Sequence, residues 1–299
     1  MTLERELKEK NLSGFKRNEP MADHTTWQVG GPADYFVTPI DLDEIAAILR
    51  LSEHYQIPLY VIGNGSNLLV LDGGIRGLVL KIGDPFCYVN KLSDGLQAGA
   101  GTAMTMLAKS ALEASLTGLE FAVGIPGSVG GAVIMNAGAF GGYIGDRVSQ
   151  VKLVNRQGQV ELLGHEQLQF SYRSSNLVGR GVVAEVTFNL SKGDSAEIGR
   201  QMEHFLNERR RRHPSLPSCG SVFRNLPGRP AGQLIEQAGG KGLRFGGAEV
   251  SQQHANFIVN RGNATAADLL NAIRTVQKLV REKHGIELQP EVKIVGEES

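Results

Sequence analysis

Two glycine-rich stretches of the chain have residue types that suit the binding of a phosphate. The longer one, residues 124–142, reads GIPGSVGGAVIMNAGAFGG and holds seven glycines, and no charged side chain occurs from residue 121 to residue 143. Its main-chain N–H groups can approach an anion closely, because glycine has no Cβ. The shorter stretch, Gly63-Asn64-Gly65-Ser66-Asn67, follows the apolar residues 59–62, which predict a buried strand. Two such loops indicate one long diphosphate ligand, although tight turns and close packing explain either loop alone equally well.

Neither loop has the spacing of the common nucleotide-binding loops. A doubly wound dinucleotide fold has Gly-x-Gly-x-x-Gly between a strand and a helix. The first loop lacks the third glycine, and Gly124, Gly127 and Gly130 are spaced three residues apart. Lys241 is followed by glycine, where a triphosphate-binding loop needs a hydroxyl for magnesium. The spacing therefore argues against both kinds of nucleotide site.

Composition and charge narrow the class of protein. The 299 residues carry 31 Lys plus Arg and 31 Asp plus Glu. A chain without net charge has no overall field to attract nucleic acid, so any anion site must be local. Four consecutive arginines, residues 209–212, favour a solvated helix end over a polyanion site. The chain has two cysteines and a charged N-terminal segment without an apolar core, which together predict a cytoplasmic protein with reduced thiols. The glycines and Pro126 of the uncharged stretch argue against its insertion into a membrane.

The elements that must position the first loop form a small α/β domain over residues 1–85. A short polar helix is expected within residues 1–18, and strands over 34–38, 59–62 and 77–82. Asp41 is a plausible N-cap for a helix whose apolar face includes Ile45 and Leu49. The second domain, residues 86–193, has expected strands over 87–90, 96–100 and 182–190, a helix over 104–112, and a hairpin of 151–154 with 160–163.

A third domain is predicted over residues 194–299. It opens with a helix over about 196–212, whose arginines complement the C-terminal dipole. Thr265 and Asp268 form a capping-box pattern at the start of a second helix, with Gly285 as its stop signal. Residues 291–295 predict a final strand.

The chain resembles the shorter form of the UDP-N-acetylenolpyruvoylglucosamine reductase family, because several short segments typical of that family occur in the same order. The matching segments are Val61-Ile62-Gly63-Asn64-Gly65-Ser66-Asn67-Leu68-Leu69, Gly124-Ile125-Pro126-Gly127-Ser128-Val129-Gly130-Gly131 through Asn136-Ala137-Gly138-Ala139, Tyr172-Arg173-Ser174-Ser175, Cys219-Gly220-Ser221-Val222-Phe223-Arg224-Asn225, Ala231-Gly232-Gln233-Leu234-Ile235 and Pro290-Glu291-Val292. The resemblance implies a mixed α+β and α/β chain with the vanillyl-alcohol-oxidase (PCMH) type of FAD-binding fold in two subdomains, followed by a C-terminal α+β substrate-binding domain. It also implies a step of peptidoglycan precursor synthesis in which NADPH reduces a noncovalently bound FAD, which then reduces the enolpyruvyl group of a UDP-sugar.

The same resemblance assigns expected roles to individual residues. It implies that FAD, with its diphosphate on both glycine loops, contacts Gly63, Asn64, Gly65, Ser66, Asn67, Gly124, Ile125, Pro126, Gly127, Ser128, Gly130, Gly131, Asn136 and Gly138. It implies that the UDP-sugar contacts Tyr172, Asn225, Lys241, Gln253 and Lys293. Arg224 stands where many members have lysine, and the shorter form lacks an inserted segment that caps the substrate, so no residue is assigned to closing over UDP.

Three residues match the family's catalytic positions, and the chemistry explains why such residue types are needed. Hydride arriving at C3 of the enolpyruvyl group leaves negative charge on C2 and the carboxylate, which Arg173 is suited to stabilise. Ser221 matches the proton donor to C2, and Glu291 matches the carboxyl residue that relays a proton. On local sequence alone, an ion-pair arginine, a turn serine and an exposed strand-edge carboxylate are the more ordinary interpretations.

Other polar residues have simpler interpretations. His24 and His254 look like members of polar networks, and no histidine pair has the spacing of metal ligands, so no metal is expected. Cys219 looks like a small buried loop residue. The alternatives are another FAD-dependent sugar or lactone oxidoreductase of the same fold, and a noncatalytic flavin or nucleotide-sugar binding protein. A monomer is the favoured oligomeric state.

Overall fold

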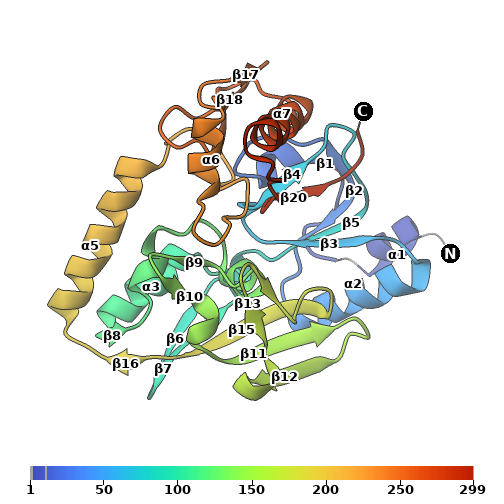
Figure 1. Cartoon of the computed structure of the whole chain (residues 1–299). Helices are drawn as coiled ribbons and strands as arrows, with labels where there is room; N and C mark the ends of the chain where they lie inside the picture. The colour runs from blue at the N-terminus through green and yellow to red at the C-terminus, as the bar shows by residue number, and fades with distance from the viewer. Residues whose placement is uncertain (1–2, 11, 299) are drawn as a thin grey trace. The chain divides into compact units, whose positions relative to one another are not determined.

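The structure is a computed structural model that describes residues 3–10 and 12–298 and contains two compact units (Figure 1). Unit 1 comprises the described residues within Met1–Arg17, Tyr35–Asn64 and Gly77–Glu208, and unit 2 comprises those within Asn18–Asp34, Gly65–Arg76 and Arg209–Ser299. The chain passes between the units several times, so neither unit is one continuous segment. The division into three domains at residues 85 and 193 stays a prediction.

The predicted strand-helix-strand segment before the first loop is confirmed. Strand β2 (Pro32–Val37), helix α2 (Leu42–Tyr55) and strand β3 (Leu59–Ile62) follow one another, and Asp41 Oδ1 accepts the N–H of Glu44 at 2.8 Å as the N-cap. These strands belong to a four-stranded sheet in the order β1-β2-β5-β3, with β1 at Lys16–Pro20 and β5 at Ile75–Lys81. β3 pairs with β5 in parallel. α1 (Leu3–Glu9) is the predicted N-terminal helix, and residues 1–2 and 11 beside it lie outside the described part.

A five-stranded antiparallel sheet is the centre of unit 1. Its order is β12-β11-β15-β7-β6, with β12 at Val160–Gly164, β11 at Val148–Asn155, β15 at Gly181–Asn189, β7 at Gly95–Gly99 and β6 at Val89–Leu92. The inner strands β11 and β15 are mostly buried apolar runs, so both faces must be covered. Helix α2 packs against β11 and β15, while α3 (Met104–Glu113) and α4 (Val129–Ile134) pack against β7.

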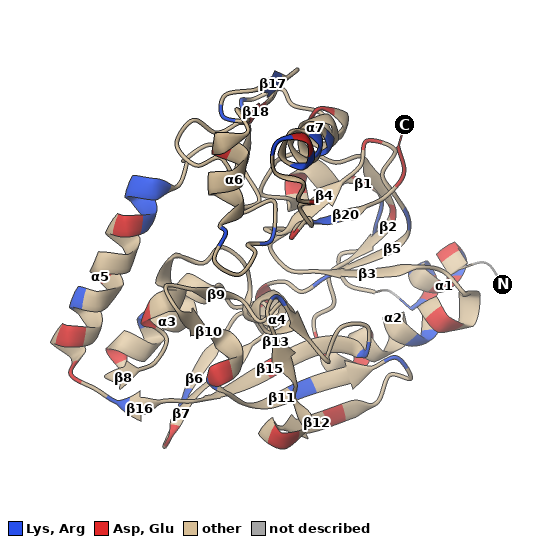
Figure 2. Cartoon of the chain, viewed as in Figure 1, with Lys and Arg blue, Asp and Glu red and all other residues tan. Residues whose placement is uncertain are grey.

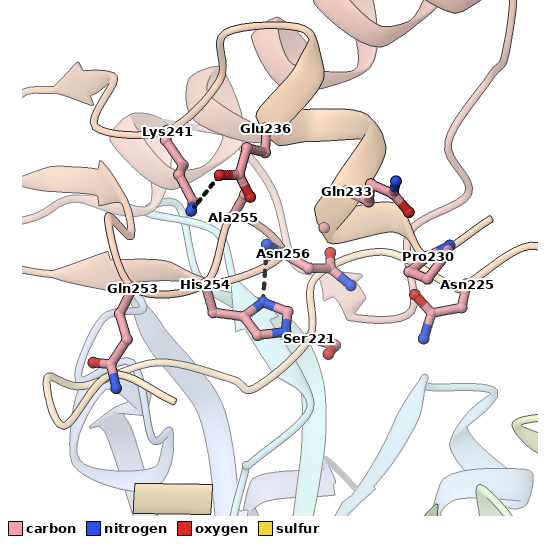
Figure 3. A pocket seen from close by; sticks show the side chains of 11 residues that line it. Ser221, Asn225, Pro230, Gln233, Glu236, Lys241, Gln253, His254, Ala255 and Asn256 are labelled. Carbon is pink, nitrogen blue, oxygen red and sulfur yellow. Dashed lines mark hydrogen bonds and ion pairs between the residues drawn. The ribbon is translucent and has the colours of Figure 1, made fainter. Parts of the chain in front are cut away.

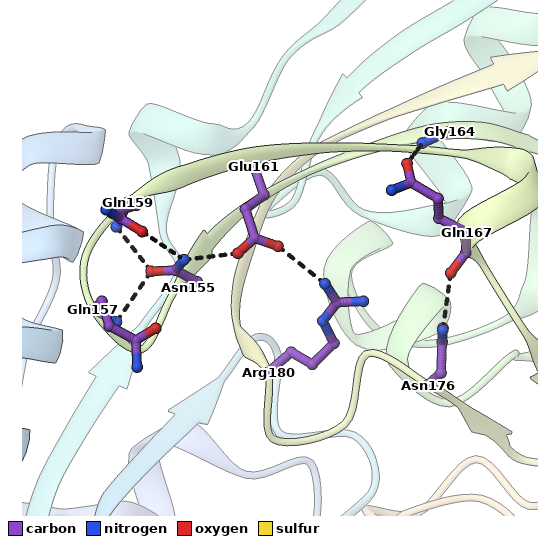
Figure 4. Close-up of polar contacts among 8 residues, drawn as sticks. All are labelled: Asn155, Gln157, Gln159, Glu161, Gly164, Gln167, Asn176 and Arg180. Atoms are coloured by element: carbon purple, nitrogen blue, oxygen red, sulfur yellow. Dashed lines mark hydrogen bonds and ion pairs between the residues drawn. The ribbon is translucent and has the colours of Figure 1, made fainter.

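The predicted hairpin between β11 and β12 is confirmed, and Asn155 holds its turn (Figure 4). The Oδ1 atom of Asn155 accepts the N–H groups of Gln157 and Gln159 at 3.0 and 2.9 Å. Its Nδ2 donates to Glu161 at 2.7 Å, and Arg180 pairs with the same carboxylate at 3.0 Å. The turn is therefore fixed by side-chain contacts as well as by its glycine.

Unit 2 has its own apolar core around Trp27, which is fully buried together with Phe223, Ile273 and Val276. The core is enclosed by α6 (Ala231–Gln237), α7 (Ala266–His284), the antiparallel strands β17 (Arg244–Phe245), β18 (Ala248–Val250) and β19 (Ile258–Asn260), and the parallel pair β4 (Leu68–Val70) and β20 (Lys293–Val295). The indole N–H of Trp27 donates to the carbonyl of Ile258 at 2.7 Å, which satisfies the one polar atom of that buried ring.

The two predicted ends of α7 are confirmed. Thr265 and Asp268 form a capping box, and Gly285 closes the helix with a φ of 65°. The carboxylate of Asp72 adds a second cap, because its oxygens accept the N–H groups of Ala266 and Ala267 at 2.9 and 2.8 Å. The N-terminal amides of α7 are therefore satisfied by side chains from two places in the chain.

Helix α5 (Ser195–Arg212) confirms the predicted long helix, and its arginines lie in the last turn (Figure 2). Arg210, Arg211 and Arg212 are exposed, as expected of a solvated helix end. Arg209 is half-buried, and its burial lowers the pKa of its guanidinium. Residues 195–208 of α5 belong to unit 1 and residues 209–212 to unit 2.

Several sequence predictions are wrong in detail. β3 is not a buried strand, because only Ile62 is buried and Val61 is 44% exposed. The second-domain strand predicted over 87–90 begins at Val89, since residues 84–86 form a 3-10 turn. The last strand begins at Lys293, so Glu291 precedes it. The remaining short elements are β8 (Leu116–Thr117), β9 (Gly138–Ala139), β10 (Gly142–Tyr143), β13 (Phe170–Ser171), β14 (Ser174–Ser175), β16 (Ser191–Lys192) and the 3-10 turns η1 (Met21–His24), η2 (Asp84–Phe86), η3 (Glu120–Gly124), η4 (Ile144–Asp146) and η5 (His165–Gln167).

Candidate active site

The two glycine-rich loops meet inside unit 1 at Gly63 and Ser128. A Cβ placed on Gly63 would lie 2.1 Å from Ser128 Oγ, so no side chain fits at this position. At its other end, within unit 2, the first loop is held where Thr26 N–H donates to the carbonyl of Gly65 at 3.3 Å. Asn64 between these two anchors is exposed. The convergence of the two loops follows the prediction made from their composition.

The second glycine stretch is only partly a loop. It contains the end of η3, the short helix α4 and the strands β9 and β10. The N–H groups of Val129 and Gly130 donate to the carbonyls of Thr102 and Ala100 at 2.8 and 2.9 Å. A Cβ on Gly130 would lie 2.9 Å from that of Ala100. The absence of a side chain at Gly130 therefore serves close packing against the residues after β7.

Asn136 connects this stretch to the segment that bears Arg173. Its Oδ1 accepts the N–H of Gly145 at 3.0 Å, and its Nδ2 donates to the carbonyl of Ser171 at 3.0 Å. The side chain is buried, so both contacts are made away from water. Asn136, predicted to contact the cofactor, thus holds two protein segments together.

Arg173 lies in a two-residue turn beside the second glycine stretch. β13 and β14 pair on either side of it, so that Tyr172 and Arg173 are the turn residues, and Arg173 has a left-handed φ of 55°. Its guanidinium lies 5.1 Å from the centre of the Tyr172 ring, and its Nη2 donates to the carbonyl of Gly138 at 3.3 Å. A non-glycine residue with positive φ is often found where function requires it. The predicted cofactor residue Gly138 and the predicted catalytic Arg173 are therefore neighbours in unit 1.

Ser221 and Glu291 lie on two paired segments of unit 2. The N–H of Glu291 donates to the carbonyl of Val222 at 2.8 Å, and the N–H of Arg224 donates to that of Gln289 at 2.9 Å. The segments thus run antiparallel, with an isolated bridge between Phe223 and Pro290. The two residues predicted to handle protons are 70 positions apart in sequence and are brought together here.

A pocket of about 270 Å³ opens beside Ser221 in unit 2 (Figure 3). Three of the residues predicted to bind substrate line it: Asn225, Lys241 and Gln253. Lys241 pairs with Glu236 at 2.8 Å, and Asn225 Oδ1 accepts the N–H of Ala231 at 2.9 Å, which fixes the start of α6. Of the other predicted substrate residues, Lys293 is exposed on β20 and Tyr172 belongs to unit 1.

Gln253 contacts the end of α5. Its Nε2 donates to the carbonyls of Arg210 and Arg211 at 3.4 and 3.0 Å, which are among the last carbonyls of the helix. The wall of the pocket is therefore attached to the arginine-bearing turn of α5.

His254 presents its ring to the pocket and is held in one tautomer. Its Nδ1 accepts the N–H of Asn256 at 3.2 Å, so the neutral ring carries its proton on Nε2 (Figure 3). Burial lowers the pKa of His254, and the nearby charges of Lys241 and Arg212 lower it further. His254 is thus a hydrogen-bonding group close to the cations of Lys241 and Arg212 and to the carboxylate of Glu236, which acts on its pKa in the opposite direction.

The Cys219 thiol is buried and free, next to the segments that carry Ser221 and Glu291. Burial raises its pKa well above the usual range, and the charge of Glu291 raises it further. A thiol that resists ionisation is a poor nucleophile, so Cys219 is the buried loop residue that its sequence predicted. No group of three His, Cys, Asp or Glu residues suited to a metal ion occurs among residues 3–10 and 12–298.

Asn256 is the structural residue that sequence reasoning missed. Its Oδ1 accepts the N–H of Phe223 and its Nδ2 donates to the carbonyl of the same residue, both at 2.9 Å. Its own carbonyl accepts the N–H of Val222 at 2.8 Å. Asn256 is 2% exposed, and its side chain makes the two hydrogen bonds to Phe223 that the backbone of a neighbouring strand would otherwise make. A lone asparagine carries no sequence signal for such a long-range contact.

The place where the two loops meet is compatible with a diphosphate-bearing cofactor. Gly63 leaves no room for a side chain, and no charged side chain interrupts residues 121–143. Polar main-chain groups without competing side chains are what a dinucleotide diphosphate requires. The residues present therefore suit the FAD expected from the sequence.

Comparisons with known proteins agree with this geometry. Residues 33–164 match the family described as FAD binding domain, and residues 212–295 match the UDP-N-acetylenolpyruvoylglucosamine reductase C-terminal domain. The UDP-N-acetylenolpyruvoylglucosamine reductase of Geobacillus thermodenitrificans is 45% identical over 288 residues, which cover 94% of this chain and 93% of the relative. The crystal structure of UDP-N-acetylenolpyruvylglucosamine reductase from Thermus caldophilus has a TM-score of 0.82 at 38% identity, covering 94% of this chain and 98% of that one.

A more distant structure shares the fold alone. A variant of the berberine bridge enzyme, solved in complex with (S)-reticuline, has a TM-score of 0.50 at 12% identity, and the match covers 64% of this chain and 43% of that one. The chain thus combines the expected type of FAD-binding domain with a C-terminal segment that matches the C-terminal domain of UDP-N-acetylenolpyruvoylglucosamine reductase. The chain belongs to the UDP-N-acetylenolpyruvoylglucosamine reductase family.

Proposed function

We propose that this protein reduces the enolpyruvyl group of UDP-N-acetylglucosamine enolpyruvate to the lactyl ether of UDP-N-acetylmuramate, with NADPH as the reductant. FAD, when bound, accepts a hydride from NADPH and delivers it to C3 of the enolpyruvyl group. The pairing of the Ser221 and Glu291 segments beside the pocket of unit 2 carries this proposal, together with the family relationship. The reaction would serve peptidoglycan precursor synthesis in the cytoplasm.

Arg173 stabilises the negative charge that develops on the substrate. Hydride addition at C3 pushes electron density to C2 and the carboxylate, so a fixed cation lowers the barrier more than a solvated one does. Arg173 has the planar fork that matches a carboxylate, and its turn holds it beside Gly138. Tyr172 supports the guanidinium through its ring face.

Ser221 donates the proton that completes the reduction at C2. The hydroxyl loses a proton to carbon, and the resulting alkoxide takes a proton back from its surroundings. Glu291 is proposed to relay that proton, since its segment pairs with the one that carries Ser221. Asn225, Lys241, Gln253 and Lys293 are proposed to contact the UDP-sugar, with Lys241 as the cation suited to its diphosphate.

Separate measurement of the two half-reactions tests the proposal. Ser221→Ala should be reduced by NADPH at the wild-type rate, while its reoxidation by the enolpyruvyl UDP-sugar should slow about 100-fold to 10,000-fold, which is the usual contribution of a general acid. Stopped-flow absorbance of the flavin reports both steps. Ser215→Ala, at an exposed serine of the same loop, is the matched control and should behave as wild type.

The proposal fails if the reduced wild-type protein is reoxidised by oxygen but not by the enolpyruvyl UDP-sugar. That result would favour an oxidase of the same fold. Equal slowing of both half-reactions in Ser221→Ala would instead remove the proton-donor role from Ser221 and leave the overall reaction in place.

A further inference from the structure

The side chain of Asn67, the last residue of the first glycine loop, contacts the backbone of Glu291. Its Nδ2 donates to the Glu291 carbonyl at 3.1 Å. Both residues belong to unit 2, where Asn67 is half-buried. The amide of Asn67 is thus directed at the peptide of the proposed proton relay.

The peptide groups on either side of the Glu291 α-carbon are held from two directions. Its N–H donates to the carbonyl of Val222 at 2.8 Å, and its carbonyl accepts from Asn67. Val222 directly follows Ser221 and is itself held by Asn256, whose carbonyl accepts the Val222 N–H at 2.8 Å. Asn67, Glu291, Val222 and Asn256 therefore form one continuous set of hydrogen bonds that passes next to both proposed proton-handling residues.

The backbone of Asn67 strengthens the same connection. Its carbonyl accepts the N–H of Lys293 at 3.0 Å, and β4 and β20 continue from there as a parallel pair, with Leu68 opposite Lys293. Glu291 comes before Lys293, the first residue of β20, so the pairing of β4 with β20 does not include Glu291. The side chain of Asn67 supplies a contact at that position.

We propose that Asn67 is a positioning residue that holds Glu291 for proton transfer, acting through the Glu291 carbonyl. This inference rests on the proposed function, since it gives Glu291 a part in the reoxidation step. A proton relay is sensitive to small displacements, because misplacement by about 1 Å can cost about 100-fold in rate. The reduction of the flavin by NADPH does not use Glu291, so the two half-reactions should respond differently to changes at Asn67.

The test uses the full-length, FAD-loaded protein with Asn67→Ala and Asn67→Asp. Because the resemblance also implies that Asn67 contacts FAD, FAD retention and reduction by NADPH are measured in parallel. We expect reoxidation by the enolpyruvyl UDP-sugar to slow about 10-fold to 100-fold more than reduction by NADPH does. Asn67→Asp keeps the shape of the side chain but replaces the donor with an oxygen that repels the Glu291 carbonyl. It should therefore be at least as slow as Asn67→Ala.

Gln277→Ala is the matched control. The Nε2 of Gln277 donates to the carbonyl of Leu288 at 2.9 Å, so its removal deletes a similar amide-to-carbonyl contact three residues before Glu291. It should leave both half-reactions unchanged. Thermal unfolding of all three variants shows whether the change at Asn67 and the change at Gln277 lower stability by the same amount.

Four results would overturn the inference: release of FAD with equal loss of both half-reactions, reoxidation at the wild-type rate, a milder effect of Asn67→Asp than of Asn67→Ala, or failure of the variants to fold while Gln277→Ala folds. The first would make Asn67 a cofactor ligand only. Failure of the wild-type protein to reduce the enolpyruvyl UDP-sugar is a separate result, because it would remove the proposed function itself.

Discussion

Replacing His213 should change how the stability of unit 2 depends on pH. The His213 ring packs 4.7 Å from the ring of Phe257 and 5.6 Å from that of His254, measured between centres. Burial lowers its pKa from 6.5 to about 4, and the charges of Arg209 and Arg212 contribute to the shift. The folded protein therefore keeps this histidine neutral at pH values where the unfolded chain protonates it.

The size and sign of the effect follow from proton linkage. Above pH 6.5 the His213 ring is neutral in the folded and the unfolded protein, so its titration does not affect the free energy of unfolding. Between pH 6.5 and about 4, only the unfolded protein binds the proton. Each pKa unit corresponds to about 1.4 kcal/mol, so the full difference is about 3 kcal/mol. Because the ring is only half-buried, solvent screening reduces this to about 2 kcal/mol. Stability present above pH 6.5 is thus lost as the pH falls towards 4.

Urea unfolding followed by tryptophan fluorescence measures this effect in the right part of the molecule. Trp27 is the single tryptophan and is fully buried in the core of unit 2, the unit to which His213 also belongs. His213→Phe keeps an aromatic ring against Phe257 and should lose less stability than wild type as the pH falls from 6.5 towards 4, by about 2 kcal/mol. His54→Phe, at an exposed histidine of α2, is the control and should follow wild type. Parallel stability curves for wild type and His213→Phe would refute the reasoning.

Three further changes test the cap of α7, the loop contact and the proposed catalytic role of Arg173. Asp72→Ala removes the acceptor of two N–H groups of α7 and should lower the free energy of unfolding by about 1 kcal/mol in the Trp27 assay, whereas an unchanged value would mean that Thr265 caps the helix alone. Gly63→Ala should weaken FAD retention measured by ultrafiltration, because its Cβ would lie 2.1 Å from Ser128 Oγ, and Ser128→Ala in the same chain should restore part of the loss. Arg173→Lys keeps the charge but loses the planar fork, so reoxidation by substrate should slow more than reduction by NADPH; equal slowing of both steps would contradict a role at the substrate carboxylate.

Elements whose ends are encoded locally could be predicted from the sequence. Asp41 caps α2, Thr265 and Asp268 cap α7, and Gly285 ends it, because each of these signals acts within one turn of the helix. The β11–β12 hairpin is local in the same sense, since Asn155 organises its own turn. Such contacts need no information about the rest of the chain.

The burial of a strand and the boundaries of the compact units depend on segments that are distant in the sequence. Local sequence patterns therefore predicted these two features less well. The apolar residues of β3 suggested a buried strand, yet only Ile62 is buried. β3 lies at the edge of its sheet and is paired with β5 alone, so its other edge has no neighbouring strand. The two compact units likewise draw on separate stretches of chain, such as residues 18–34 in unit 2. A local pattern of apolar residues cannot show which distant segment will cover it.

The candidate site shows the same distinction at the level of single side chains. Ser221 and Glu291 look like a turn serine and a strand-edge carboxylate on local sequence, and only the resemblance to a family assigned them roles. Their neighbourhood is created by asparagines that bond across long separations: Asn67 to Glu291, and Asn256 to Phe223. Asn136 does the same in unit 1, between the second glycine stretch and the Arg173 turn.

The chemistry of the carboxamide group explains why asparagine recurs around the site. A carboxamide presents donor and acceptor groups in one plane, as a peptide group does, so it can pair with a backbone segment where no strand is available. Serine offers a shorter reach, and aspartate or glutamate would add a charge beside main-chain carbonyls. The proposed catalytic residues lie outside the regular strands, and neutral amides can hold such irregular backbone in place without changing the local charge. Geometry near Ser221, Glu291 and Arg173 therefore depends on residues whose sequence pattern indicates only turns.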